Sequence, residues 1–214
     1  GKREIGDARN QLFREYCRLL EGLRPRAFVM ENVSGMVKGD FKIVFAEILR
    51  TLKGCGYRVK ARLLNAMFFG VPQSRERMIF VGVREDIGRE PSHPAGWSVP
   101  VTVGGALPWC DWIGITDKAL TRDYHAGRKR RFARDDVTFT VSKSGAFGVT
   151  MSEVVKRMRD GAVVPADVRD AARLGSFPDA FSFVGSSGWE RIGNSVPPLL
   201  MRSIARHVRN LIAR

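Results

Sequence analysis

The chain has 214 residues, of which 44% are hydrophobic and 27% are charged, as in a soluble globular protein with one core and room for a small appended domain. Its apolar runs all fall short of the roughly 20 residues that a membrane-spanning helix needs. The net charge of +14, from 36 Lys+Arg against 22 Asp+Glu, favours a polyanionic partner, although general solubility is the alternative explanation.

Neither the cysteines nor the histidines have the spacing of a metal site. The chain has no CxxC pair, and its three cysteines and three histidines are scattered along it. We therefore predict reduced thiols, as in a cytosolic protein, and no bound metal. The residues concerned are Cys17, Cys55, Cys110, His93, His125 and His207.

The first part of the chain has the element order of an α/β domain. Apolar spacing predicts helices over 10–24 and, after an Asp40 cap, over 41–54. Between them, the short apolar run 27–30 is typical of a buried strand in a parallel sheet. Two further strands are predicted over 57–64 and 78–83.

The composition changes near Asp86. Residues 88–150 are rich in Gly, Pro, Trp, Arg and Ser, with short possible strands at 98–103 and 138–141 and no convincing helix. This stretch is predicted to be a small irregular domain. It separates the α/β part, residues 1–87, from a final part, residues 151–214.

The final part returns to helical spacing. Helices are predicted over 152–160 and 165–174, and a last helix over 197–209 begins at a double proline. We expect these helices to pack back onto the α/β domain.

Three segments carry polar groups that suggest more than packing. Glu31 directly follows the first predicted strand, where open α/β sheets collect ligand groups, although it could instead cap the next turn. Arg75 and Arg77 point to one side of a segment that enters a strand. They form either a structural pair with a carboxylate or a fork for a phosphate or a base carbonyl. Asn194 and Ser195 precede the double proline, so they either cap a helix or hold a small ligand.

Two of these segments resemble motifs of the DNA cytosine-5 methyltransferases. Met30–Val33 resembles the Glu-Asn-Val signature of that family. Asn65–Arg77 resembles its Asn-Ala…Tyr-Gly-Val-Pro-Gln-x-Arg-x-Arg segment, with Phe69 in place of the usual tyrosine. Residues 1–13 are similar to the segment just after the family's Pro-Cys loop.

The end of the chain carries the same resemblance. Arg169–Gly185 is similar to the family's Arg-Glu-Ala-Ala-Arg-Leu-Gln-x-Phe-Pro helix and turn, from which Asp170 and Gly175 depart. Arg191–Pro198 is similar to its last motif almost letter for letter. The resemblance implies an α/β fold with the Rossmann-like sheet of class I S-adenosylmethionine-dependent methyltransferases, incomplete at its N-terminus. Residues 88–150 would be the small target-recognition domain.

The resemblance also implies roles for individual residues. The family flips a cytosine out of double-stranded DNA and methylates its carbon 5 from S-adenosyl-L-methionine. Glu31 would contact and protonate the base at ring nitrogen 3, Arg77 would bind its carbonyl oxygen, and Arg75 would hold the site's geometry. The cofactor pocket would be lined by Asn194, Ser195 and, more weakly, Leu12.

DNA contacts are expected in two places. Lys2 and Arg3 suit phosphate contacts from a mobile loop. In the recognition domain, phosphate or guanine-edge contacts are expected from Arg128, Lys129, Arg130 and Arg131 and from the nearby Arg122 and Arg134, unless these form only a solvated basic surface. Trp109 and Trp112 are expected to pack in the core of that domain rather than to touch DNA.

The departure from the family is large. The glycine-rich cofactor turn, the acidic residue for the ribose and the Pro-Cys nucleophile loop are missing, and by position no cysteine of the chain replaces the nucleophile. We therefore expect the chain alone not to transfer methyl groups. It would be a truncated enzyme, one piece of a split enzyme with a partner that carries the first half, or a non-catalytic DNA-binding relative. A cytoplasmic, nucleoid-associated protein of a bacterium or phage, as in restriction–modification, is expected.

Overall fold

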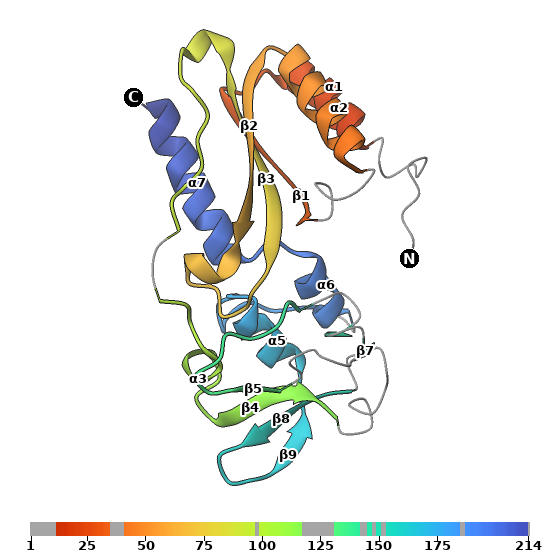
Figure 1. Ribbon diagram of the computed structural model, residues 1–214, viewed down its shortest axis with the longest axis vertical. Coiled ribbons are helices and arrows are strands. Elements are labelled where there is room, and N and C mark those ends of the chain that lie inside the picture. Colours follow the sequence, from red (N-terminus) through yellow and green to blue (C-terminus); the bar gives the residue numbers. More distant parts are fainter. Residues whose placement is uncertain are drawn as a thin grey trace. The chain divides into compact units, whose positions relative to one another are not determined.

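The structure is a computed structural model that describes residues 12–34, 41–96, 99–116, 131–141, 145–146, 149–150, 153–184 and 187–213. The chain divides into two compact units (Figure 1). The first unit comprises Gly1–Leu64, Glu76–Ala95 and Ile204–Arg214. The second unit comprises Asn65–Arg75 and Gly96–Ser203.

The first unit is built on a three-stranded sheet in the order β1-β3-β2. Its strands are β1 (Ala27–Val33), β2 (Tyr57–Asn65) and β3 (Glu76–Arg84), and a short 3-10 turn, η4 (Glu85–Ile87), follows β3. β1 and β3 run antiparallel, with Ala27 opposite Val83 and Val33 opposite Arg77.

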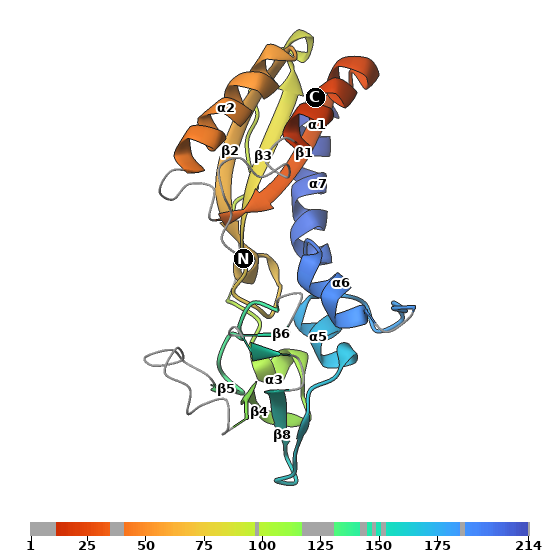
Figure 2. The same ribbon diagram turned by 90° about the vertical axis from the view of Figure 1, so that its right-hand side faces the viewer.

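Both faces of this sheet are covered within the first unit. The helices α1 (Leu12–Leu23) and α2 (Phe41–Gly54) lie on one face, and the C-terminal half of α7 (Pro198–Ala213) runs along the other (Figures 1 and 2). Because successive strand residues point to opposite faces, β3 must be apolar on both sides, which explains its continuous apolar run. The core beneath α1 and α2 includes Phe13, Cys17, Leu20, Phe28, Val44, Ile48, Leu52, Tyr57, Val59, Met78 and Phe80.

The helices over 10–24 and 41–54 and the strands over 57–64 and 78–83 are confirmed within the described residues, whereas Asp40 lies outside them. The parallel pairing expected for 27–30 is wrong. β1 pairs antiparallel with β3, and among the described strands it forms the edge of the sheet. Of its seven residues only Phe28 is buried. β1 also continues to Val33, so that Glu31 lies inside the strand and not after it.

The second unit has a four-stranded antiparallel sheet in the order β5-β4-β8-β9. Its strands are β4 (Cys110–Ile115), β5 (Arg131–Ala133), β8 (Val154–Met158) and β9 (Val163–Pro165). Two two-residue strands, β6 (Gly145–Ala146) and β7 (Val149–Thr150), pair with each other. The helical elements are η3 (Ala66–Phe69), α3 (Val103–Ala106), α5 (Val168–Leu174), α6 (Gly188–Asn194) and the first turns of α7.

Two expectations for this unit are wrong. The region 98–103 forms no strand in its described residues, and α3 begins at Val103. The predicted helix over 152–160 is instead the strand β8. The alternation of this strand is hidden in the sequence because one of its inward-pointing residues is a lysine. Lys156 points into the unit, where its ammonium lies 2.7 Å from the carboxylate of Asp170 on α5, so a polar residue occupies a core position.

The predicted helices over 165–174 and 197–209 are confirmed as α5 and α7. The short strand predicted over 138–141 is reduced to an isolated bridge between Thr138 and Gln73. Asp167 and Asp170 make a reciprocal capping box at the start of α5, which fixes where that helix begins. Among the described residues, no helix is long and apolar enough to cross a membrane.

We expect Thr138→Val to raise the free energy of unfolding by about 1 kcal/mol, because the Thr138 hydroxyl is buried and has no hydrogen-bond partner in the described part of the chain. Thr140→Val is the matched control. Its hydroxyl donates to the Ser74 carbonyl, so its loss should cost about 1 kcal/mol. Urea titration of both variants measures the two changes, and a destabilised Thr138→Val would contradict the interpretation of that hydroxyl.

Candidate active site

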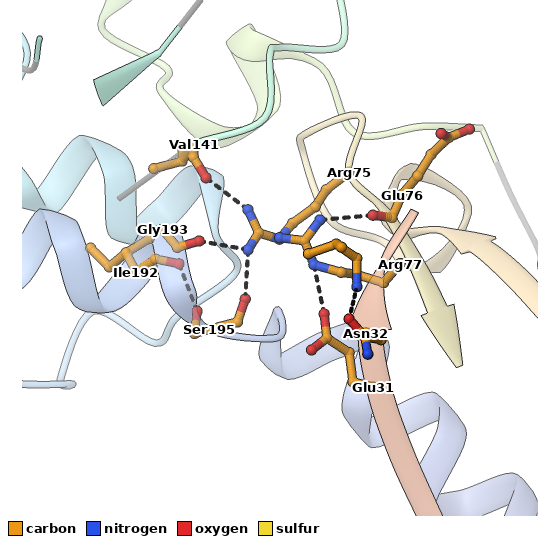
Figure 3. A network of polar contacts seen from close by, with 10 residues as sticks. Glu31, Asn32, Arg75, Glu76, Arg77, Val141, Ile192, Gly193 and Ser195 are labelled. Carbon is orange, nitrogen blue, oxygen red and sulfur yellow. Dashed lines mark hydrogen bonds and ion pairs between the residues drawn. The ribbon is translucent and has the colours of Figure 1, made fainter. Parts of the chain in front are cut away.

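In the first unit, a charged pair links β1 to β3. Nε of Arg77 lies 2.7 Å from Oε1 of Glu31 (Figure 3). Glu31 is opposite Ile79 in the register, so Arg77, two residues before Ile79, points to the same face of the sheet. The antiparallel register therefore brings together two residues that lie 46 positions apart in the sequence.

The pair is largely withdrawn from solvent. The side chains of Arg77 and Glu31 are 16% and 27% exposed. Burial lowers the pKa of Arg77, and the neighbouring carboxylate of Glu31 counteracts part of that shift. Nη1 of Arg77 also donates to the Glu76 carbonyl at 2.7 Å, which fixes the direction of the guanidinium. A guanidinium has five N–H donors, so Arg77 has donors beyond these two contacts for a carbonyl oxygen.

In the second unit, Arg75 is 1% exposed and acts as an internal anchor. Its Nη1 donates to the Val141 carbonyl at 2.7 Å, and its Nη2 donates to the carbonyls of Gly193 and Ser195 at 2.7 and 2.9 Å (Figure 3). Arg75 thus joins its own segment to the end of α6 and to the stretch that ends at Val141. The sequence left open whether Arg75 and Arg77 together form a ligand-binding fork. That alternative fits poorly, because these N–H donors of Arg75 bind backbone carbonyls.

Gln73 has a similar role that the sequence reasoning missed. Its side chain is buried, donates to the Leu174 carbonyl at 2.8 Å and accepts from the backbone N–H of Val141 at 3.1 Å. Asn65 supports the same segment, because its Oδ1 accepts from the backbone N–H groups of Met67 and Arg75. The sequence feature that could have indicated this role is the position of Gln73, two residues before the buried Arg75 in the same motif.

The three residues expected to line the cofactor pocket differ in the groups that they can still present to a ligand. Ser195 ends α6, and its hydroxyl donates to the Ile192 carbonyl at 2.8 Å, so it can only accept from a ligand. Asn194 is exposed at the end of α6. Both lie at the C-terminal end of that helix and do not cap α7. Leu12, in the first unit, is 64% exposed at the start of α1.

Two of the residues expected to contact DNA can be located, Arg131 and Arg134. Nη1 of Arg134 donates to the carbonyls of Pro108 and Cys110, both at 2.9 Å, whereas Arg122 lies outside the described residues. Lys2, Arg3, Arg128, Lys129 and Arg130 lie outside the described residues, whereas Arg131 is exposed on β5.

The two tryptophans of the second unit differ in their surroundings. Trp109 packs against the core cluster of the unit, as expected, and the guanidinium of Arg173 stacks on its ring. The expectation for Trp112 is wrong, because Trp112 is only half-buried, is not among the residues packed on that cluster, and carries Arg131 over its ring at 4.7 Å.

The three cysteines have the environment of structural thiols. Burial raises the pKa of Cys17 to about 12 and that of Cys110 to about 11, and burial also raises the pKa of Cys55. All three are free thiols, with Cys17 and Cys110 buried. A nucleophilic cysteine needs a stabilised thiolate, which these sites disfavour. Among the described residues, no group of metal-ligating side chains is placed to hold an ion.

The thiols should make stability fall at high pH. Unfolded thiols ionise near pH 9, whereas folded Cys17 and Cys110 stay protonated until about pH 12 and 11. The folded state therefore holds more protons in this window, so its stability is complete below pH 9 and declines above it. Urea midpoints measured between pH 8 and 11 should show the decline, and Cys17→Ala should flatten it. An equally steep decline in Cys17→Ala would contradict the assignment.

Comparison with known proteins gives the fold first. A putative DNA modification methyltransferase encoded within a prophage of E. coli superposes with a TM-score of 0.70 at 22% identity, over 97% of this chain and 76% of that one. The methyltransferase EhMeth of Entamoeba histolytica superposes with a TM-score of 0.68 at 14% identity, over 96% of this chain and 70% of that one. The α/β methyltransferase fold expected from the sequence is thereby confirmed.

Sequence relatives then give the family. The family model for C-5 cytosine-specific DNA methylase matches residues 1–103. The type II methyltransferase M.NgoPII of Neisseria gonorrhoeae is 30% identical over 99% of this chain and 73% of its own length. M.BsuRI of Bacillus subtilis is 33% identical over 98% of this chain, which spans 55% of that relative. The chain belongs to the DNA cytosine-5 methyltransferase family, and it spans about half to three-quarters of the length of these relatives.

Proposed function

We propose that this chain supplies the base-binding part of a DNA (cytosine-5)-methyltransferase. The observation that carries the proposal is the Arg77–Glu31 pair, two complementary charged groups held at 2.7 Å and largely shielded from water in a chain of that family. A cytosine offers a carbonyl oxygen next to ring nitrogen 3, which is the acceptor pattern that a guanidinium beside a carboxyl group can match.

Each residue has a distinct task in this proposal. Arg77 donates to the carbonyl oxygen of the flipped cytosine, and its contact with the Glu76 carbonyl keeps it aimed. Glu31 holds a proton at ring nitrogen 3, so that negative charge does not build up on the ring when a nucleophile adds to carbon 6. Proton transfer of this kind contributes roughly 10²–10⁴ to a rate. Arg75 is a positioning residue, because its donors bind backbone carbonyls inside the second unit.

S-adenosyl-L-methionine, when bound, would supply the methyl group. The residues of this chain fit only part of a site for it. Asn194 offers an exposed amide and Leu12 an exposed apolar side chain, whereas Ser195 offers only acceptor capacity because its hydroxyl is already donated.

We further propose that the nucleophile comes from polypeptide outside these residues. The raised pKa values of Cys17, Cys55 and Cys110 argue against each of them in that role. The source would be the N-terminal half of a longer chain or a complementary subunit of a split enzyme. A non-catalytic relative that only binds DNA is the competing function, favoured by the same lack of a suitable thiol.

The substrate would be duplex DNA, in keeping with the net charge of +14. Contacts from Arg131, and from Lys2, Arg3 and residues 128–130, remain part of this proposal. The relatives M.BsuRI and M.NgoPII are named type II methyltransferases, which supports a role in restriction–modification inside a bacterial or phage-infected cell, close to the nucleoid.

The test is methyl transfer with complementation. The chain would be fused to the part of M.NgoPII that lies outside the match, and incubated with unmethylated genomic DNA and S-adenosylmethionine labelled in its methyl group. We expect labelled 5-methyldeoxycytidine with the fusion and none with either piece alone. DNA retention by a folded fusion that binds S-adenosylmethionine but yields no 5-methyldeoxycytidine would favour the DNA-binding relative and overturn the enzymatic proposal.

A further inference from the structure

Two of the three cysteines meet beneath the helices of the first unit. Cys17 lies on the inner side of α1 and is 5% exposed, whereas Cys55 lies in the turn between α2 and β2, half-buried against the same core cluster. The thiol of Cys17 donates a hydrogen bond to the sulfur of Cys55. The fold therefore makes neighbours of two sulfurs that lie 38 positions apart in the sequence.

Hydrogen bonding distinguishes the two thiols. Burial raises the pKa of Cys17 to about 12, and the hydrogen bond that this thiol donates adds to the rise. Burial also raises the pKa of Cys55, but the hydrogen bond from Cys17 offsets part of that rise, because a donor stabilises a thiolate. Cys55 is thus the thiol of the pair that ionises first. Its reactions should be slow at neutral pH and accelerate as the pH rises.

Cys55 is also the thiol of the pair that a small molecule can reach. It lines a cavity of about 290 Å³, together with the exposed Glu21 and Arg24 and the half-buried Arg84. Two guanidiniums and one carboxylate suit a small molecule that carries charges of both signs better than an apolar one. Glu21 also lies within hydrogen-bond reach of the Cys55 thiol, so its carboxylate can accept the proton that this thiol loses.

We infer that Cys17 and Cys55 form a redox-active dithiol, which a small disulfide of the glutathione class converts to a disulfide bridge. The Cys55 thiolate attacks one sulfur of the small disulfide, whose S–S bond breaks, and the small thiolate released takes up the proton that Cys55 lost. The Cys17 sulfur then attacks the Cys55 sulfur, displaces the second small thiolate and gives that thiolate its proton. The protein loses two hydrogens, and one small disulfide becomes two small thiols.

The bridge would join α1 to α2, which lie on the same face of the sheet (Figure 1). Its formation requires the two sulfurs to move from hydrogen-bond contact to a bond of about 2.05 Å. The bridge closes a loop that contains β1, so it restricts the unfolded chain around the strand that carries Glu31. The oxidised first unit should therefore be harder to unfold. This inference goes beyond methyl transfer and does not depend on it.

The test is mass spectrometry of the reduced 214-residue chain after incubation with glutathione disulfide at mildly alkaline pH. Wild type should lose the mass of two hydrogens, keep only Cys110 free for alkylation after unfolding, and yield a proteolytic fragment in which Cys17 is joined to Cys55. Below the pKa of Cys55 the rate should rise about tenfold per pH unit. The urea midpoint should rise on oxidation, and dithiothreitol should reverse both changes.

Three variants assign the roles of the thiols. Cys17→Ala should stop at the mixed disulfide, with one glutathionyl group on Cys55, because no second thiol displaces it. Cys55→Ala should leave Cys17 unmodified, because Cys17 is buried. Cys110→Ala is the matched control, since it removes a buried thiol from the second unit, and it should form the bridge as wild type does.

Three results in wild type would overturn the inference. These are a mixed disulfide that persists on Cys55, a bridge that includes Cys110, and unmodified Cys17 and Cys55 under conditions in which the urea-unfolded chain reacts. All three are measured on the wild-type chain, so they hold even if a variant fails to fold. Methylation is not among the readouts, so a failure of the proposed function leaves this test valid.

Discussion

Glu31→Gln in the complemented enzyme is expected to lower the methylation rate by roughly 10²–10⁴, the contribution of a well-placed proton donor. The amide keeps the size of the carboxyl group and can still accept from Arg77, but it cannot deliver a proton to ring nitrogen 3. Arg77 and Glu31 are largely shielded from water, at 16% and 27% exposed, and Glu31→Gln leaves Arg77 without its counter-charge, so this substitution should also lower the free energy of unfolding by about 1–3 kcal/mol.

Glu76→Gln is the matched control for this substitution. Glu76 begins β3, one residue before Arg77, and its side chain is exposed. Methylation rate, DNA affinity and urea stability should all stay at wild-type values in this variant. If Glu31→Gln kept more than about a tenth of the wild-type rate, the acid role would be wrong, because general acid catalysis contributes at least about 10².

Arg75→Met is expected to have the largest effect on stability. It removes the hydrogen bonds to the carbonyls of Val141, Gly193 and Ser195, and each buried carbonyl left without a donor costs about 1–3 kcal/mol. Relief from burying a cation offsets part of that loss, which leaves a net decrease of about 3–5 kcal/mol in the free energy of unfolding. Urea titration followed by tryptophan fluorescence measures this change.

Two further substitutions test whether the loss of stability in Arg75→Met comes from its hydrogen bonds to the three carbonyls. Arg75→Lys keeps the charge but cannot reach three carbonyls with a fixed fork, so an intermediate loss is expected. Arg62→Met removes an exposed strand arginine and should stay within about 0.5 kcal/mol of wild type. A stability of Arg75→Met equal to that of Arg62→Met would contradict the anchoring role.

The first unit could largely be predicted from sequence, because its signals are local. The apolar stripe of α1 and the alternating or continuous apolar runs of β2 and β3 each specify their own element. The direction of β1 could not be predicted, because an apolar run of a few residues fits either a parallel or an antiparallel partner. Its antiparallel pairing with β3 depends on tertiary structure.

The second unit was harder to predict, because its short strands carry exceptions to the usual patterns. In β8, the inward-pointing Lys156 is neutralised by Asp170, which lies 14 residues further on and in another element. In α6, the glycines at both ends gave no helical signal, although Trp189 and Ile192 are buried on its inner side.

At the candidate site, the identities of the residues could be predicted from local motifs, but their partners depend on the tertiary structure. The family motifs were enough to name Glu31, Arg75 and Arg77. Their partners were not evident, because Arg75 binds carbonyls 66 to 120 residues further along the chain. Gln73 went unassigned for the same reason, since its partner Leu174 lies 101 residues away.

The most direct test of the central claim, that Arg77 and Glu31 hold a flipped cytosine, uses 2-aminopurine in a duplex. The probe would replace a base next to the target cytosine, at the site mapped from methylated genomic DNA, so that the flipped cytosine keeps its carbonyl oxygen and ring nitrogen 3. The fluorescence of the probe, which rises when its stacked neighbour leaves the duplex, and the duplex affinity would be measured on one sample. With the complemented wild-type enzyme we predict a rise in fluorescence on binding. Arg77→Ala should abolish that rise while salt-sensitive duplex binding stays close to wild type. Equal loss of both signals, or an undiminished rise in Arg77→Ala, would contradict the claim.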